Sequence, residues 1–240
     1  MIGPDENEFA PKPVKNEVKP APGEAHWRED RTGFHWDKKT IYHGTNTSGI
    51  VTFEFAGEST IGNNAVYFTS DRSLAKGYAQ LRRRENGAGT AIVYEAVVED
   101  IDLMNWVEKK VVDVLKQKFM AYCVSLENEL EASDFEEFAT AHMLESQITK
   151  RLVQLALRRI IEHCEGDVIH GGNIKLIAQG VMGIFFQEFV KLSGFNGVIT
   201  IEGGDDPKFT AKPGISVVVY DRDKITSLSE KVVSDETDEQ

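Results

Sequence analysis

The sequence predicts an α+β fold, in which an antiparallel or mixed sheet is interrupted by a large helical insertion. Two observations lead to this prediction. Five short segments are rich in β-branched and aromatic residues, and residues 104–192, between the third and fourth of them, have apolar residues at helical spacing. Strands distant in sequence must therefore meet to close the sheet, which argues against a simple βαβ series.

The five predicted strands are bounded by Gly, Asn, Asp or Pro, residues that favour turns. They are residues 40–43 (TIYH), 65–69 (AVYFT), 90–98 (TAIVYEAVV), 197–201 (GVITI) and 215–221 (ISVVVYD).

A first helix is predicted directly after the second strand. Ser70 or Asp71 is its expected N-cap, and Leu74, Tyr78 and Leu81 fall on one face. The sequence ENGAG then ends the helix.

Three further helices are predicted in the insertion. The first has an apolar stripe at every third or fourth position: Val111, Leu115, Phe119, Tyr122, Leu126 and Leu130. The second begins at a capping box of Ser133 and Glu136, and its stripe is Phe138, Ala141, Ile148, Leu152 and Leu155, broken by Glu145. The third spans residues 174–192 and ends at Gly194.

The two ends of the chain are predicted to be tails. Residues 1–37 are rich in Pro, Lys and Glu as far as about Arg31, and such a composition buries too little apolar surface to offset the entropy of ordering. Residues 230–240 form an acidic tail. The folded domain is therefore expected to span residues 38–229, with the helical insertion at about 104–192.

Charge and hydropathy restrict the functions to be considered. The formal net charge is −12 and the pI about 5.0, so the chain as a whole is repelled by nucleic-acid phosphates and anionic lipid. No apolar run is long enough to span a membrane, and the N-terminus has no signal-peptide core. Cys123 and Cys164 are expected to be reduced and structural. We therefore expect action in the cytoplasm.

Several polar motifs admit a functional and a structural interpretation. His163, Cys164 and His170 fit no common metal site, so no metal is predicted. The segment HGGN at 170–173 is either a phosphate-binding turn or a plain turn. The basic segment LRRREN at 81–86 is either a solvated helix end or a contact for a pyrophosphate or an acidic partner.

Tyr67 and Tyr78 also admit two interpretations. One ends a predicted strand and the other lies in the second turn of the next helix, so their rings can either form a slot for a flat heteroaromatic ligand or pack in the core. Spacing alone leaves both open.

Four segments carry a resemblance to a known family. They are YHGT (42–45), VYFTSDRSLAKGYA (66–79), GFNGVI (194–199) and SVVVYDRDKITS (216–227). Together they resemble ADP-ribosyltransferases of the diphtheria-toxin and poly(ADP-ribose) polymerase type, and most of all the phage and mobile-element group found in polyvalent proteins. The resemblance covers about residues 39–229 without the helical insertion and implies a split sheet of that family's kind.

The resemblance implies a role for each matching residue. His43 would hydrogen-bond a ribose hydroxyl of NAD, with Thr45 as a helper, and the backbone of Gly44 would meet the nicotinamide carboxamide. Tyr67 and Tyr78 would enclose the nicotinamide ring. Ala75 stands where some polymerases of the family have a serine that contacts the carboxamide.

One position departs from the family pattern. Ser216 stands where the family commonly has a glutamate before the last strand, and a serine has no charge to stabilise an oxocarbenium-like cation. Ser216 is the expected catalytic counterpart of that glutamate, without chain elongation into polymer. Glu202, Asp205 and Asp206 are candidates for a substitute carboxylate.

The resemblance therefore implies an NAD-dependent mono-ADP-ribosyltransferase that modifies a protein or nucleic acid and releases nicotinamide, plausible as a phage, toxin or effector enzyme acting in its own or a host cytoplasm. The alternatives are an NAD glycohydrolase and an inactive NAD- or ADP-ribose-binding protein. The loop at 53–64 would gate the site, and the helical insertion would offer a surface to a protein partner.

Overall fold

The computed structural model describes residues 25–28, 32–53, 65–87, 89–166, 174, 176–202 and 214–233. The strands in this part of the chain are β1 (Ala25–Trp27), β2 (Gly33–Thr45), β3 (Val66–Thr69), β4 (Ile92–Asn105), β5 (Gly197–Glu202), β6 (Gly214–Val219) and β7 (Ile225–Val232). The helices are α1 (Arg72–Asn86), α2 (Lys109–Ala132), α3 (Phe135–Ala141), α4 (Lys150–Glu165), α5 (Gly180–Leu192) and the short 3₁₀ helix η2 (Arg222–Lys224).

The seven strands form one mixed sheet in the order β1-β2-β3-β6-β5-β4-β7, and β2 also pairs with β4. The pairings β2–β3, β3–β6, β6–β5, β5–β4 and β4–β2 therefore form a closed ring. The β4–β5 pair is parallel and the other pairs are antiparallel. The predicted α+β class is confirmed.

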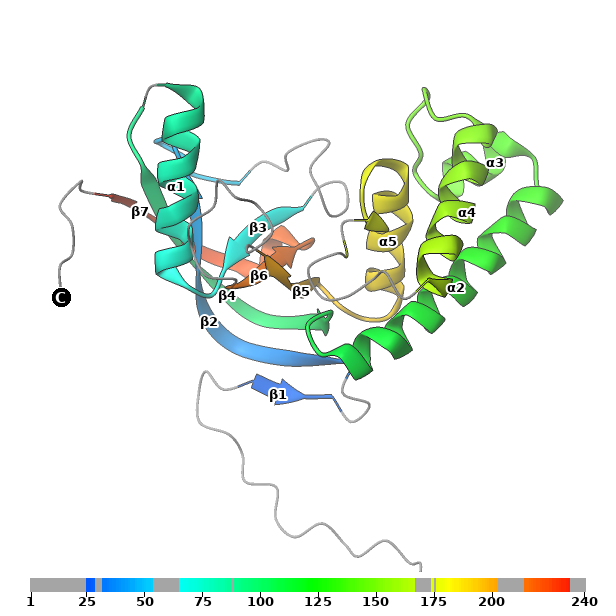
Figure 1. Cartoon of the computed structure of the whole chain (residues 1–240), viewed down its shortest axis with the longest axis horizontal. Coiled ribbons are helices and arrows are strands. Elements are labelled where there is room, and N and C mark those ends of the chain that lie inside the picture. The colour runs from blue at the N-terminus through cyan, green and yellow to red at the C-terminus, as the bar shows by residue number, and fades with distance from the viewer. Residues whose placement is uncertain are drawn as a thin grey trace, which may run out of the picture.

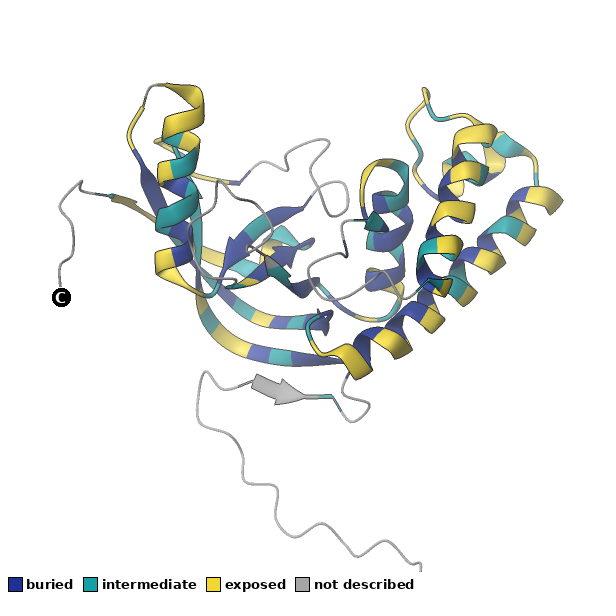
Figure 2. Cartoon of the chain, viewed as in Figure 1, coloured by how far each residue is buried: buried dark blue, intermediate teal, exposed yellow. Residues whose placement is uncertain are grey.

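The five strands of the ring share one apolar core, to which each of them contributes. Its members are Phe34, Trp36, Ile41, Phe53, Val66, Phe68, Ile92, Tyr94, Ala96, Val98, Ile101, Leu103, Ile199, Val217 and Val219. The alternation of buried and more exposed residues along β2 and β4 is visible in Figure 2. This core fixes the ends of β2 and β3 relative to each other.

Helices α2 to α5 lie at one end of the sheet, opposite α1 (Figure 1). They pack around Phe119, Phe185, Phe186 and Phe189, and the same core includes Met104, Val198 and Val218 from the strands. The helical insertion is thus joined to the sheet by shared apolar burial.

Helix α1 packs closely against the C-terminal part of β2. A Cβ added to Gly44 would lie 1.9 Å from the carbonyl oxygen of Ala75, so only a glycine allows this approach. Asp71 caps the helix, because its carboxylate accepts a hydrogen bond from the Ser73 amide at 2.7 Å. The end of the helix is Gly87, which has a φ of 65°.

The sheet is larger than predicted at both ends of the chain. β1 and the first residues of β2 lie inside the segment expected to be a tail, so the boundary at residue 37 is wrong. Phe34 and Trp36 are buried and alternate with more exposed residues, which is a strand pattern. β7 was missed because it is mostly exposed and polar, and it continues past the boundary at residue 229 to Val232.

The second predicted helix of the insertion is two helices in the structure. Ser133 is the C-cap of α2, and Asp134, not Ser133, caps α3 through the Glu136 amide at 2.8 Å. Leu152 and Leu155 of the predicted stripe are about half exposed, at 46% and 53%, and α4 instead buries Val153, Ala156, Leu157 and Ile160. The third predicted helix starts later than expected, at Gly180.

Both cysteines are buried thiols without a disulfide. Burial raises the pKa of Cys123 and of Cys164, which keeps both protonated. In the described part of the chain, no helix is both long and apolar enough to cross a membrane.

Candidate functional site

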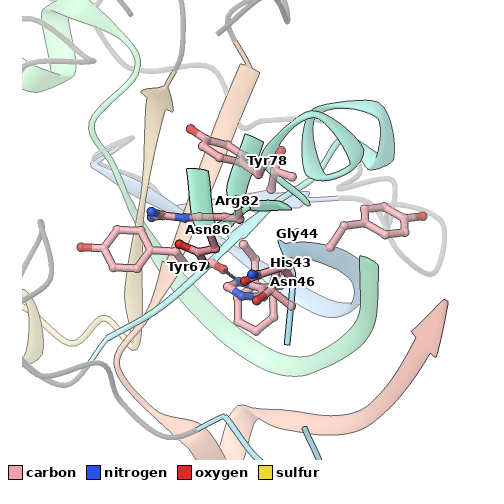
Figure 3. Close-up of a pocket in the computed structure, with 11 residues that line it drawn as sticks. His43, Gly44, Asn46, Tyr67, Tyr78, Arg82 and Asn86 are labelled. Atoms are coloured by element: carbon pink, nitrogen blue, oxygen red, sulfur yellow. Dashed lines mark hydrogen bonds between the residues drawn. The ribbon is translucent and has the colours of Figure 1, made fainter. Parts of the chain in front are cut away.

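A cavity of about 430 Å³ lies where β2 and β3 separate beside α1. In the described residues, these two strands are in register at one pair, Tyr42 and Thr69. The lining residues come from three elements: Tyr42, His43, Gly44, Thr45 and Asn46 at the end of β2; Tyr67, Phe68 and Thr69 from β3; and Tyr78, Arg82 and Asn86 from α1. Their arrangement is shown in Figure 3.

His43 links the two strands at this separation. Its Nδ1 is 2.7 Å from the carbonyl oxygen of Tyr67, and because a carbonyl only accepts, Nδ1 carries the proton. The ring also makes edge contacts with Phe53 and Phe68, at centroid distances of 4.9 and 6.0 Å. Burial, with a smaller effect of the Arg82 charge, lowers the pKa of His43. In the neutral ring Nε2 is therefore a hydrogen-bond acceptor.

The two tyrosines reach the cavity from different elements. Tyr67 lies on β3 and Tyr78 on α1, and both line the cavity with His43. Tyr78, Arg82 and Asn86 are spaced by four residues, which places them on one stripe of α1. In Figure 3 the Arg82 side chain extends to the same side as that of Tyr67.

The residues after His43 are held by the C-terminal strand. The Tyr94 hydroxyl donates to Glu230 Oε2 at 2.6 Å and accepts from the Ile50 amide at 3.0 Å. The Gly49 amide donates to the same carboxylate oxygen at 2.8 Å. These bonds fix the segment between the cavity and Phe53, whose ring packs on His43.

Ser216 and Ala75 are not among the described lining residues of the cavity. Ser216 is buried in β6, in register with Thr69 on one side and Thr200 on the other. Its registered neighbour Thr69 does line the cavity. Ala75 is fully buried against Gly44. The structure thus brings together His43, Gly44, Thr45, Tyr67 and Tyr78 but places Ser216 one strand further away.

Other sequence candidates lie outside the described residues. They are Asp205 and Asp206, the segment 170–173 and most of the loop 53–64, of which Phe53 is described. Nothing is described of the Glu202 side chain. The described residues contain no group of three side chains suited to hold a metal ion.

Four lining residues were not expected from the sequence as site residues: Tyr42, Asn46, Phe68 and Thr69. Arg82 and Asn86 belong to the segment LRRREN, for which the sequence left open a pyrophosphate contact, an acidic partner or a solvated helix end. Both continue the spacing of Tyr78 along α1 by steps of four. The positions on β2 and β3 could not be found this way, since the separation of the two strands is a tertiary feature.

The cavity combines aromatic rings, a neutral imidazole and one cation. Arg82 is the only charged side chain among its described lining residues, which include no carboxylate. Such a lining is suited to a ligand with a flat ring and a negative charge.

Comparisons with known proteins identify no family. No protein-family model matches the chain, and no curated protein matches it. A crystal structure of the MbcT–MbcA toxin–antitoxin complex from M. tuberculosis is similar, with a TM-score of 0.42 and 10% sequence identity over 85% of this chain and 89% of that chain. At this TM-score and identity, the similarity does not establish a shared family or function.

Proposed function

We propose that the protein is an NAD-dependent mono-ADP-ribosyltransferase, which releases nicotinamide and passes ADP-ribose to a macromolecule. One observation carries the proposal. His43, Gly44, Thr45, Tyr67 and Tyr78, which carry the sequence resemblance, come from β2, β3 and α1 and line a single cavity. NAD is the co-substrate.

The geometry suggests how this lining holds NAD. With its Nδ1 proton donated to Tyr67, the neutral His43 ring offers Nε2 to a ribose hydroxyl. The rings of Tyr67 and Tyr78 contact the flat nicotinamide. Positioning of this kind lowers the barrier by holding the reacting groups in a reactive pose.

The reaction breaks the bond between C1 of the ribose and the nicotinamide nitrogen. Nicotinamide leaves with the bonding electron pair, the ribosyl carbon becomes oxocarbenium-like, and a nucleophile of the acceptor attacks it and loses its proton. The described lining supplies no carboxylate to stabilise the cation, and Ser216 is buried beside Thr69. We therefore propose a single transfer without polymer growth, assisted by the acceptor.

The setting of the enzyme is also part of this proposal. Unpaired, buried Cys123 and Cys164 suit a reducing cytoplasm, its own or that of a host. A toxin or effector role, with a protein partner at the helical insertion, suits a domain in which α2 to α5 lie at the end of the sheet opposite α1 (Figure 1).

The test uses NAD labelled on the adenylate phosphate, incubated with the full chain and a cell lysate. The variants are His43→Ala and Tyr67→Ala, and the control is Arg84→Gln, an exposed residue of α1 that does not line the cavity. We expect label bound to protein or nucleic acid with the wild type and Arg84→Gln. With the other two variants we expect about a hundredfold less, the usual effect of misplacing a reacting group.

Two results would contradict the proposal. Release of nicotinamide with all label remaining as free ADP-ribose would make the protein a glycohydrolase. No nicotinamide release at all, with ADP-ribose still bound, would make it an inactive binding protein.

A further inference from the structure

Arg82 stands out because of its charge and its place. It is the only charged side chain among the described residues that line the cavity, in a chain whose formal net charge is −12. Helix α1 has five basic residues and one acidic residue, so its charge is opposite to that of the whole chain. The positive charge at the cavity therefore comes from α1 and is opposite in sign to the net charge of the chain.

The guanidinium of Arg82 is accessible to a ligand. Its side chain is 62% exposed, and its ion pair among the described residues is with Glu85, at 3.4 Å. An exposed pair at this distance contributes little to stability, so a ligand can replace it at low cost. The charge also acts inside the cavity, because it helps to lower the pKa of His43.

The spacing along α1 separates a ring contact from a charge contact. Tyr78 and Arg82 lie one helical turn apart, a rise of about 6 Å along the axis. In a dinucleotide, a sugar separates the base from the diphosphate, so a ring held at Tyr78 leaves the diphosphate further along the stripe. Guanidinium groups bind phosphate oxygens with two parallel hydrogen bonds.

We propose that Arg82 binds the diphosphate of the dinucleotide and makes the site selective for nucleoside diphosphates over uncharged nucleosides. This inference rests on the proposed function, because it takes NAD as the ligand. Arg82 acts here as a binding residue, and the neighbouring Arg83 and Arg84 do not line the cavity.

The test measures the binding of ADP-ribose, ADP and the uncharged nucleoside adenosine by calorimetry to the wild type, Arg82→Gln, Arg82→Lys, Arg84→Gln and His43→Ala. For Arg82→Gln we expect the Kd for ADP-ribose and ADP to rise about tenfold or more, the usual effect of losing a charge-assisted hydrogen bond. Affinity for adenosine is unchanged, because it has no phosphate. Arg82→Lys recovers part of the loss, and Arg84→Gln binds like the wild type.

The outcomes separate this inference from the proposed function. If Arg82→Gln binds ADP-ribose like the wild type while His43→Ala does not, the role of Arg82 is overturned and the proposed function stands. An equal loss in Arg84→Gln also overturns it, since only the general charge of α1 would matter. If ADP binds through Arg82 but ADP-ribose does not bind, the phosphate site stands and the proposed function fails. If none of the ligands binds to the wild type, both are overturned.

Discussion

Gly44 has a packing role in the structure, where it lies against the Ala75 carbonyl. We propose a second role, in which its backbone contacts the nicotinamide carboxamide. The close packing against Ala75 by itself leaves no room for a side chain at position 44. The same glycine therefore sets the distance between β2 and α1, and with it the width of the cavity.

Replacement of Gly44 by Ala should consequently destabilise the protein. A Cβ 1.9 Å from a backbone oxygen forces α1 away, at a cost of about 1–3 kcal/mol in the free energy of unfolding, measured with urea. The control is Gly87→Ala, where a Cβ meets nothing and only the φ of 65° matters, at about 1 kcal/mol. Full stability with lost ADP-ribose binding would show that the ligand contact, not packing, requires the glycine.

His43 makes stability depend on pH in a known direction. Its pKa in the folded protein lies below the ordinary 6.5, so on acidification the unfolded chain takes up a proton before the folded chain does. The free energy of unfolding of the wild type should therefore fall, relative to His43→Gln, as pH decreases through 6.5. Urea unfolding of both proteins between about pH 7 and pH 5 measures this difference. If the free energy of unfolding changed equally with pH in both proteins, the prediction would be contradicted.

At the scale of elements, β7 supports the site from a distance in sequence. Tyr94 and Glu230 face each other in the β4–β7 register, and together they hold the amides of Gly49 and Ile50. The C-terminal strand is therefore part of the site's support, although the sequence analysis treated Glu230 as the start of an acidic tail.

Removal of this carboxylate by Glu230→Ala should loosen the segment after the cavity. We expect faster hydrogen exchange at the Gly49 and Ile50 amides and weaker ADP-ribose binding, with Lys231→Ala as the exposed control. The hydrogen bonds from Tyr94 and Gly49 lower the pKa of Glu230 below 4.5, so the contribution is present above that pH and is lost as pH falls through the folded pKa. Unchanged exchange at neutral pH would show that the loop is held by other contacts.

Elements differ in how well the sequence predicted them. β3, β4, β5, β6 and α1 were found because their apolar periodicity is strong and their ends have turn residues or a cap such as Asp71. β7 was missed because an exposed edge strand needs little apolar alternation. The single helix predicted after Ser133 is two helices, because the chain turns between the C-cap His142 and the N-cap Thr149, where Met143 has a positive φ of 49°.

At the scale of the whole molecule, long-range pairing makes the site. β3 lies beside β6, whose residues follow it by about 150 positions, and this pairing positions the backbone carbonyl of Tyr67 against Nδ1 of His43. The helical insertion does not interrupt the closed ring of strands. It begins after β4 and ends before β5, and these two strands pair in parallel. The insertion and the ring are joined by one core that includes Met104, Val198 and Val218.

The sequence by itself determined the α+β class, the types of most elements and five of the residues that line the cavity. Periodicity, capping and turn residues are local properties, so they can be read along the chain. Only the tertiary structure decided that Arg82 and Asn86 join the cavity, that Ser216 lies buried beside Thr69, and that Gly44 meets Ala75. These contacts depend on which distant strands pair and how closely α1 packs on them, and that is determined by the burial of the whole core.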